Sequence, residues 1–391
     1  MDFRPGRHFL QIPGPSPVPD RVLRAMDRAV IDHRGPEFAE LGLNVLRDIK
    51  PVFGTESHVI IFPSSGTGAW EAALVNTLSP GDRVLMFETG QFASLWLELA
   101  RKLGIEVDFV DGDWRTGVNA GQVEEKLRAD TSHTYKAVCM VHNETSTGVT
   151  SNVSNVRNAM DAVRHSALLM VDTISSLGSI SYQHDAWGVD VTVSGSQKGL
   201  MLPPGLGFNA ISEKALQISK SNGLTRSYWD WQAMIANNAS GFFPYTPATN
   251  LLYGLQESLS MLTEEGLDKV FSRHDRMAEA TRRAVQAWGL EVLCKNPDEY
   301  SSVLTGVMMP DGVDADAVRK VILDNFDMSL GMGLGKMKGK ILRIGHLGEI
   351  NELTLIGALS GVEMGLSLAE VSYQKGGVAQ AMSYLTETAE R

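Results

Sequence analysis

The sequence lacks the features of several large protein classes. Its 391 residues include only two cysteines, Cys139 and Cys294, which are too few for a disulfide framework or a cysteine-based zinc site. No apolar run approaches the roughly 20 residues that a transmembrane helix requires, and the first residues do not form the apolar core of a signal peptide. We therefore expect a globular protein of a reducing cytoplasm.

The sequence also has fewer basic than acidic residues. The chain has 35 lysines and arginines against 46 aspartates and glutamates, a net charge of −11. This balance argues against nucleic acid or an anionic membrane surface as a partner. Small anionic substrates remain compatible with it, because they respond to local rather than net charge. The length predicts one large and one smaller domain.

Short apolar runs alternate with amphipathic helical segments from residue 59 onwards, which predicts an α/β fold with a largely parallel sheet. Most runs are continuous, as in strands that are covered on both faces. In such sheets ligands bind outside the carboxyl ends of the strands. The predicted strands of this sheet are residues 59–62, 84–87, 107–110, 137–141, 167–171, 189–193 and 207–211.

The two ends of the chain differ from this central pattern. Four prolines and a glycine predict an extended segment over residues 8–20, followed by a helix with Asp20 as its N-cap. Residues 221–249 are predicted to be irregular, and a later group of two strands and several helices predicts a second α+β unit. The expected division is an extended N-terminal segment 1–20, a large domain 21–265 and a small C-terminal domain 266–391.

A polar, glycine-containing loop follows the first predicted strand. Ser64-Ser65-Gly66-Thr67-Gly68 precedes a helix that is predicted to begin near Ala69. Its glycines, hydroxyls and helical N–H groups can hold a phosphate, although the same residues also fit an ordinary turn with a serine cap. The loop has neither the Gly-Lys-Ser/Thr of a Walker loop nor the G-x-G-x-x-G of a dinucleotide site.

Three more polar groups follow other strands. Asp172 closes the run 167–171, where it can cap a helix, bind a metal or pair with a pyridinium nitrogen. The turn 142–148 can bond a cofactor oxygen or simply build the turn. Lys198 follows a strand and a turn, and a partly desolvated lysine there can attack a carbonyl. Together, a phosphate cradle, an acid and a lysine at neighbouring strand ends describe a pyridoxal phosphate site.

The segments that carry this constellation resemble those of a class V, fold-type I aminotransferase, and the resemblance extends over nearly the whole chain. It implies a large domain with a mostly parallel seven-stranded sheet, a smaller C-terminal α+β domain and pyridoxal 5′-phosphate as cofactor. The matching segments are Ser65-Gly66-Thr67-Gly68, Val171-Asp172 and Ser194-Gly195-Ser196-Gln197-Lys198. Those similar to the serine–glyoxylate and alanine–glyoxylate branch are Asp32-His33-Arg34, His142-Asn143-Glu144-Thr145, Gly195-Ser196-Gln197-Lys198-Gly199, Phe243-Pro244-Tyr245-Thr246-Pro247 and Arg343-Ile344-Gly345-His346.

The resemblance also implies roles for single residues. Lys198 would form the Schiff base with the cofactor and carry the proton transfer, Asp172 would pair with the ring nitrogen, and Arg343 would bind the substrate α-carboxylate. Members of the family often place a tryptophan over the cofactor ring, where this chain has Phe92. The remaining implied contacts are Ser65, Gly66, Thr67 and Gln197 on the phosphate, Thr145 on the ring 3-oxygen, and Tyr245 and Thr246 reaching the phosphate of the other subunit in a homodimer.

The implied reaction transfers the amino group of a small L-amino acid, foremost L-serine, to glyoxylate and gives hydroxypyruvate and glycine. Aspartate and alanine remain open as donors, and for aspartate a second cation could come from His33 or Arg34. A lyase such as a cysteine desulfurase needs a nucleophilic cysteine on a mobile loop, whereas Cys139 lies in a predicted strand and Cys294 in the second domain. A catalytically silent relative would have no need to keep the whole set of site residues.

Overall fold

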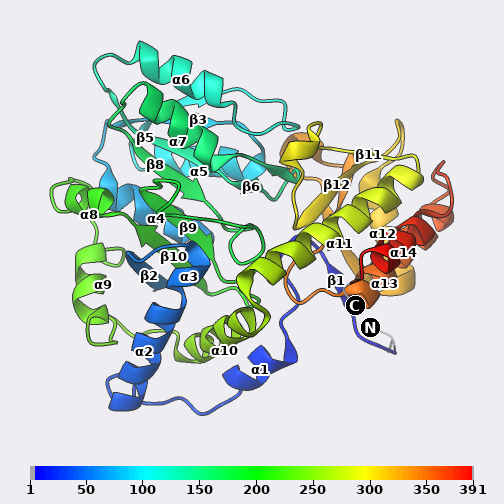
Figure 1. Ribbon diagram of the computed structural model, residues 1–391, viewed down its shortest axis with the longest axis horizontal. Helices are drawn as coiled ribbons and strands as arrows, with labels where there is room; N and C mark the ends of the chain where they lie inside the picture. Colours follow the sequence, from blue (N-terminus) through cyan, green and yellow to red (C-terminus); the bar gives the residue numbers. More distant parts are fainter. Residues whose placement is uncertain (1–4, 390–391) are drawn as a thin grey trace.

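The computed structural model describes residues 5–389, and its strands form two main sheets and one short hairpin (Figure 1). The larger sheet contains seven strands and the smaller one five. The strands of the larger sheet are β2 (His58–Pro63), β3 (Arg83–Phe87), β4 (Glu106–Val110), β5 (Tyr135–Val141), β8 (Leu168–Asp172), β9 (Val191–Gly195) and β10 (Leu206–Ile211). The smaller sheet contains β1 (Phe9–Gln11), β11 (Glu291–Val292), β12 (Leu304–Met308), β13 (Met328–Met332) and β14 (Ile341–Gly345), and the hairpin pairs β6 (Asn143–Glu144) with β7 (Val149–Thr150).

The larger sheet has the order β2-β10-β9-β8-β5-β3-β4 and is parallel except at β10, which runs antiparallel to β2 and β9. Because β10 reverses direction relative to both neighbours, β2 runs the same way as β9. The carboxyl ends of β2, β5, β8 and β9 therefore lie at one edge of the sheet. The predicted seven-stranded, mostly parallel sheet is confirmed.

Helices cover both faces of this sheet (Figure 1). Along β2, Val59 and Ile61 pack into one core, while Ile60 and Phe62 pack into the other. This double burial explains why the strands appear in the sequence as continuous apolar runs. The helices are α1 (Asp20–Met26), α2 (Pro36–Asp48), α3 (Lys50–Phe53), α4 (Gly66–Thr77), α5 (Gln91–Lys102), α6 (Ala120–Ala129), α7 (Val153–Ala162), α8 (Glu213–Ser219), α9 (Trp231–Asn238), α10 (Thr249–Glu265), α11 (Leu267–Ala287), α12 (Ala315–Phe326), α13 (Glu352–Leu368) and α14 (Gly377–Glu387).

Four local predictions were wrong. Asp20 lies in the first turn of α1 rather than at its N-cap, which is Pro19. Helix α4 begins at Gly66 rather than near Ala69, because Ser65 already has the extended conformation of an N-cap. Strand β9 lies two residues later than predicted and includes residues 194 and 195. The supposedly irregular segment 221–249 contains α9, whose N-cap Asp230 accepts hydrogen bonds from two backbone amides of the first turn.

The smaller sheet joins the two ends of the chain. Strand β1 pairs in parallel with β13, so the extended segment that was predicted over residues 8–20 supplies an edge strand to a sheet formed otherwise by residues 291–345. In Figure 1 the blue β1 accordingly lies among yellow and orange elements. Strands β1, β11 and β13 were not predicted. We propose the domain division 1–20, 21–265 and 266–391, of which residues 1–4 and 390–391 lie outside the described part.

None of the helices within residues 5–389 has the length and apolar character needed to cross a membrane.

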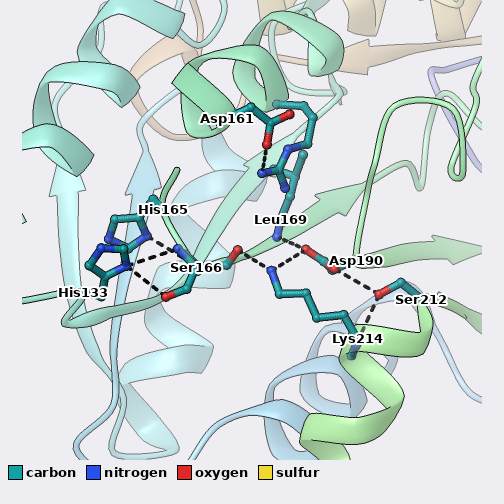
Figure 2. A network of polar contacts seen from close by, with 11 residues as sticks. His133, Asp161, His165, Ser166, Leu169, Asp190, Ser212 and Lys214 are labelled. Atoms are coloured by element: carbon teal, nitrogen blue, oxygen red, sulfur yellow. Dashed lines mark hydrogen bonds and ion pairs between the residues drawn. The ribbon is translucent and has the colours of Figure 1, made fainter. Parts of the chain in front are cut away.

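A polar network joins the amino ends of the central strands, opposite the edge at which the polar loops gather. Figure 2 shows His133 stacked on His165, with ring centroids 4.3 Å apart, and Asp190 next to Lys214. Asp190 accepts the backbone N–H of Leu169 at 2.9 Å, and the Lys214 ammonium donates to the carbonyl of residue 167 at 2.9 Å. These contacts hold the amino ends of neighbouring strands together, at the edge of the sheet opposite the polar loops.

The Asp130 carboxylate of this network provides a stability prediction. Its side chain is 7 % exposed and accepts the amide and hydroxyl of Thr134, the amide of Tyr135 and Nε2 of His165. Burial acts to raise the pKa of Asp130, but the hydrogen bonds from Tyr135 and Thr134 outweigh it and hold the pKa well below its usual range.

Asp130→Asn replaces an acceptor by a donor, so it should lower the free energy of unfolding by about 1–3 kcal/mol in urea titrations at pH 7. Asp161→Asn, at a 62 % exposed side chain, is the control and should change it by less than about 0.5 kcal/mol.

Because the folded-state pKa of Asp130 is lowered, its contribution is fully present above the unfolded value of about 3.9 and is lost as pH falls toward the folded value. The difference between wild type and Asp130→Asn should therefore stay constant from about pH 5 to 8 and shrink below about pH 4. Equal stability of the two proteins at pH 7 would contradict this assignment.

Candidate active site

A cavity of about 230 Å³ opens at the carboxyl edge of the larger sheet. It lies where β2, β5, β8 and β9 end, as expected for a largely parallel α/β sheet. The structure brings eight of the predicted site residues into its lining, namely Ser65, Gly66, Thr67, Phe92, Thr145, Asp172, Gln197 and Lys198. Gly14, Pro15, Trp70, Asn143 and Ile174 line it as well, although none of them was predicted.

Lys198 lies just beyond β9 and is 6 % exposed. Its Nζ donates a hydrogen bond to the carbonyl of Pro13 at 2.6 Å. Burial, and after it the charge of Arg343, lower the pKa of Lys198 against the opposite effect of the Asp172 and Glu144 carboxylates, and the resulting pKa is about 7. Near neutral pH a large share of this amine is therefore unprotonated and able to act as a nucleophile or a base.

Asp172 is the last residue of β8 and is 3 % exposed. Its Oδ1 accepts the backbone N–H of Ile174 at 2.7 Å, and its Oδ2 accepts Nε1 of Trp70 at 2.8 Å. Burial raises the pKa of Asp172, the Ile174 hydrogen bond opposes this rise and the charge of Glu144 adds to it, and the resulting pKa is about 7. These two hydrogen bonds fix the plane of the carboxyl group, which can accept a further hydrogen bond from a group in the cavity.

The N-terminus of α4 provides an anion-binding surface in the cavity. Ser65 is its N-cap but makes no capping hydrogen bond, so its side chain leaves the first helical N–H groups free. Within residues 5–389, Oε1 of Gln197 is buried and has no hydrogen-bond partner. A Cβ at Gly66 would lie 2.2 Å from Cδ1 of Ile174, so a side chain at this position would have to displace that of Ile174, which lines the cavity. A helix N-terminus with unpaired polar groups suits a phosphate-like group.

Glu144, which sequence reasoning left without a role, positions the side of the cavity that contains Phe92. It is completely buried, and its two oxygens accept the backbone N–H groups of Phe92 and Ala93 at 3.3 and 3.2 Å. Ser146 donates its N–H and hydroxyl to the same carboxylate, and its hydroxyl oxygen accepts the N–H of Gln91. Glu144 and Ser146 thus satisfy the free N–H groups at the start of α5, which has no side-chain cap of its own.

Arg343 lies on β14 beside the cavity rather than in its lining. Its Nε donates to the carbonyl of Met332 at 2.8 Å and its Nη1 to the carbonyl of Thr145 at 2.6 Å. Burial lowers the pKa of Arg343 to about 10, so the guanidinium remains charged at neutral pH. Two hydrogen bonds to the backbone fix the direction of a cation whose other N–H groups are available to a carboxylate.

Tyr245 and Thr246 do not line this cavity. Tyr245 stacks on Tyr228, with ring centroids 4.2 Å apart and planes at 6°, and Thr246 is exposed. His33 and Arg34 lie outside the lining as well, the first half-buried and the second exposed. The structure of one chain therefore does not bring these four residues together with Lys198.

The extended N-terminal segment closes one side of the cavity. Ser16 donates its N–H to the carbonyl of Gln197 and its hydroxyl to the carbonyl of Lys198, both at 2.9 Å. Gly14 has a φ of +122°, and a Cβ there would lie 2.3 Å from Nζ of Lys198, so a side chain at this position would displace the amine. The density of proline and glycine indicated an extended chain, but no sequence signal placed it against Lys198.

Comparisons with known proteins agree with this geometry. The family model "Aminotransferase class-V" matches residues 8–333. The chain is 49 % identical to the serine–glyoxylate aminotransferase of Methylorubrum extorquens, over 98 % of this chain and 97 % of that protein. It is 41 % identical to the L-aspartate–glyoxylate aminotransferase of Paracoccus denitrificans, over 96 % of each. The structure of the ureidoglycine–glyoxylate aminotransferase of Bacillus subtilis superposes with a TM-score of 0.91 at 26 % identity, over 99 % of this chain and 100 % of that one.

The hydrogen bonds of Glu144 provide a testable prediction. In Glu144→Gln the new amide N–H₂ points at backbone N–H donors, so at least one buried donor loses its acceptor. We expect the free energy of unfolding to fall by about 2–3 kcal/mol in urea titrations. Glu349→Gln, at an exposed glutamate, is the control and should have an effect below about 0.5 kcal/mol. An equally small effect of both substitutions would show that Glu144 does not hold the start of α5.

Proposed function

The chain belongs to the class V aminotransferase family, and on this premise we propose that it is a pyridoxal phosphate-dependent transaminase that moves the amino group of a small L-amino acid to glyoxylate. Its fold is the fold-type I α/β fold. L-serine is the proposed donor, with hydroxypyruvate and glycine as products. The observation that carries the proposal is the cavity in which buried Lys198 and Asp172 lie together with the uncapped N-terminus of α4.

The residues around the cavity fit this cofactor. The first N–H groups of α4, with Ser65, Thr67 and Gln197, would hold the phosphate, and Asp172 would accept the protonated ring nitrogen. Phe92 would lie against the ring, in the position at which other members of the family often have a tryptophan. When bound, pyridoxal phosphate supplies an electron sink for the negative charge that develops at the substrate Cα.

Two side chains of this protein account for the remaining chemistry. Lys198 has a pKa near 7 and can therefore take a proton from the substrate Cα and return one. Arg343 would bind the α-carboxylate through the N–H groups that the backbone of Met332 and Thr145 leaves free. Because amino acid and 2-oxo acid share that carboxylate, one cation serves both halves of the reaction.

The comparisons favour serine over aspartate as donor, because the serine–glyoxylate relative is the more similar of the two, at 49 % against 41 % identity. An aspartate side chain needs a second cation, and the candidates His33 and Arg34 lie outside the lining of their own chain. Aspartate and alanine stay as alternatives that the experiment below separates.

The proposal includes a homodimer. Tyr245 and Thr246 lie outside the cavity of their own chain, and Tyr245 is held by its stack on Tyr228. We propose that both residues reach the phosphate in the partner subunit. The cytoplasmic location stays a prediction.

The amino donor can be identified in a half-reaction. Excess L-serine, L-alanine or L-aspartate is added separately to the yellow holoenzyme, and its visible absorbance is followed. We expect the fastest bleaching with L-serine and recovery of the colour on adding glyoxylate. Lys198→Ala should still bind the cofactor but lose turnover by at least about 10³-fold, because it lacks the acid–base group.

Faster bleaching with aspartate or alanine would identify that amino acid as the donor and would leave the proposed transamination mechanism unchanged. A protein that stays colourless with added pyridoxal phosphate, or a Lys198→Ala variant with near-normal activity, would reject the proposed function.

The lowered pKa of Lys198 predicts how the apoprotein takes up its cofactor. The rate of covalent loading, followed by visible absorbance with pyridoxal phosphate in excess, should rise with pH through about 7, as the amine loses its proton, and then level off. Nα-acetyl-lysine in the same buffers is the control, and its rate should keep rising toward a pKa of about 10.4. A loading rate that also rises up to pH 10 would show that burial does not neutralise the amine.

A further inference from the structure

The turn between β13 and β14 reaches across from the smaller sheet to the larger one. We call residues 333–340, which include the 3₁₀ turn Gly335–Met337, the hairpin tip. β13 pairs antiparallel with β14, so that Gly331 lies opposite Arg343. Met332, whose carbonyl accepts Nε of Arg343, is the residue directly before the tip. The position of the tip therefore affects the carbonyl that orients the guanidinium.

An ion pair holds the tip against the end of β3. Nζ of Lys336 lies 2.5 Å from Oε1 of Glu88, whose side chain is 11 % exposed. The same carboxylate accepts Nε1 of Trp114 at 3.1 Å and the N–H of Gly112 at 3.3 Å. The Lys336 ammonium also lies 5.5 Å from the centroid of the Trp114 ring. The hydrogen bonds from Trp114 and Gly112 thus fix the Glu88 carboxylate in the position in which it pairs with Lys336.

Backbone strain and close packing occur at the same contact. Trp114 has a φ of 63°, a left-handed conformation that is rare for a bulky side chain and persists only where the surroundings impose it. A Cβ at Gly335, itself at φ +48°, would lie 2.6 Å from the Trp114 ring and 2.2 Å from Oε1 of Gln91. Gln91 precedes Phe92, so the tip contacts the helix start that borders the cavity.

We propose that Lys336 is a positioning residue for the substrate carboxylate: its contacts with Glu88 and Trp114 hold the hairpin tip to the larger domain and thereby fix Met332 and the guanidinium of Arg343. The inference deepens the proposed function and rests on it. An ion pair with one exposed member adds little to global stability, but it restricts where a short turn lies. Loss of the pair should therefore weaken substrate binding rather than slow the chemistry.

The test compares Lys336→Met with Lys338→Met. Both residues lie in the hairpin tip, and Lys338 has no ion pair with any residue of the described part. In the holoenzyme, Lys336→Met should raise KM roughly threefold to fivefold for both L-serine and glyoxylate, the size expected of a partly exposed ion pair, and leave kcat within about twofold. The KM of both the wild type and Lys336→Met should rise between 0.05 and 0.5 M salt, because salt also screens the attraction between Arg343 and the substrate carboxylate, but the rise should be steeper in the wild type, which has the Lys336–Glu88 pair to lose. Lys338→Met should behave like the wild type.

A second measurement does not depend on the reaction. Hydrogen exchange of residues 333–340 in the apoprotein should be faster in Lys336→Met and in Glu88→Gln than in the wild type, and no faster in the double variant than in either single one. Unchanged exchange, or a KM of Lys336→Met equal to that of the wild type, would overturn the inference. If the wild type does not transaminate at all, the proposed function is wrong. Faster exchange in the variants would then show only that Lys336 holds the hairpin tip against Glu88, without a role in substrate binding.

Discussion

The burial of one amine is the constraint on which the rest of the site depends. A lysine in water is protonated at neutral pH, and desolvation is the largest of the effects that bring the pKa of Lys198 down to about 7. The surrounding elements must therefore exclude bulk water and still leave a cavity beside the amine. The carboxylates that oppose this effect, Asp172 and Glu144, are themselves held by N–H donors, which limits how strongly they stabilise the ammonium form.

The enclosure is built by segments that are distant in sequence. The N-terminal segment places the carbonyl of Pro13 on the amine and the Ser16 hydroxyl on the carbonyl of Lys198. Two helix N-termini face the cavity for opposite purposes. The start of α4 is uncapped and available to an anion, whereas that of α5 is satisfied by Glu144 and Ser146 and serves to place Phe92. The smaller sheet contributes Arg343, a cation held by backbone carbonyls on both sides.

Prediction from the sequence was accurate where the pattern is local. The strands of the larger sheet were recognised because both of its faces are buried and the runs are continuously apolar. The membership in the class V family was also predicted and is confirmed. The start of α4 was placed too late because glycine is a poor helix former, and α9 was missed because a loop-like composition hid the Asp230 cap.

The family, the mostly parallel sheet and eight of the residues that line the cavity could be predicted from the sequence, because each depends on a strand and the few residues after it. The groups that surround these residues follow from the packing of distant segments. Trp70 bonds Asp172 across 102 positions of the chain, and Lys198 bonds Pro13 across 185. Contacts between residues so far apart leave no periodicity or spacing in the sequence, since they arise only when separate elements pack around one cavity.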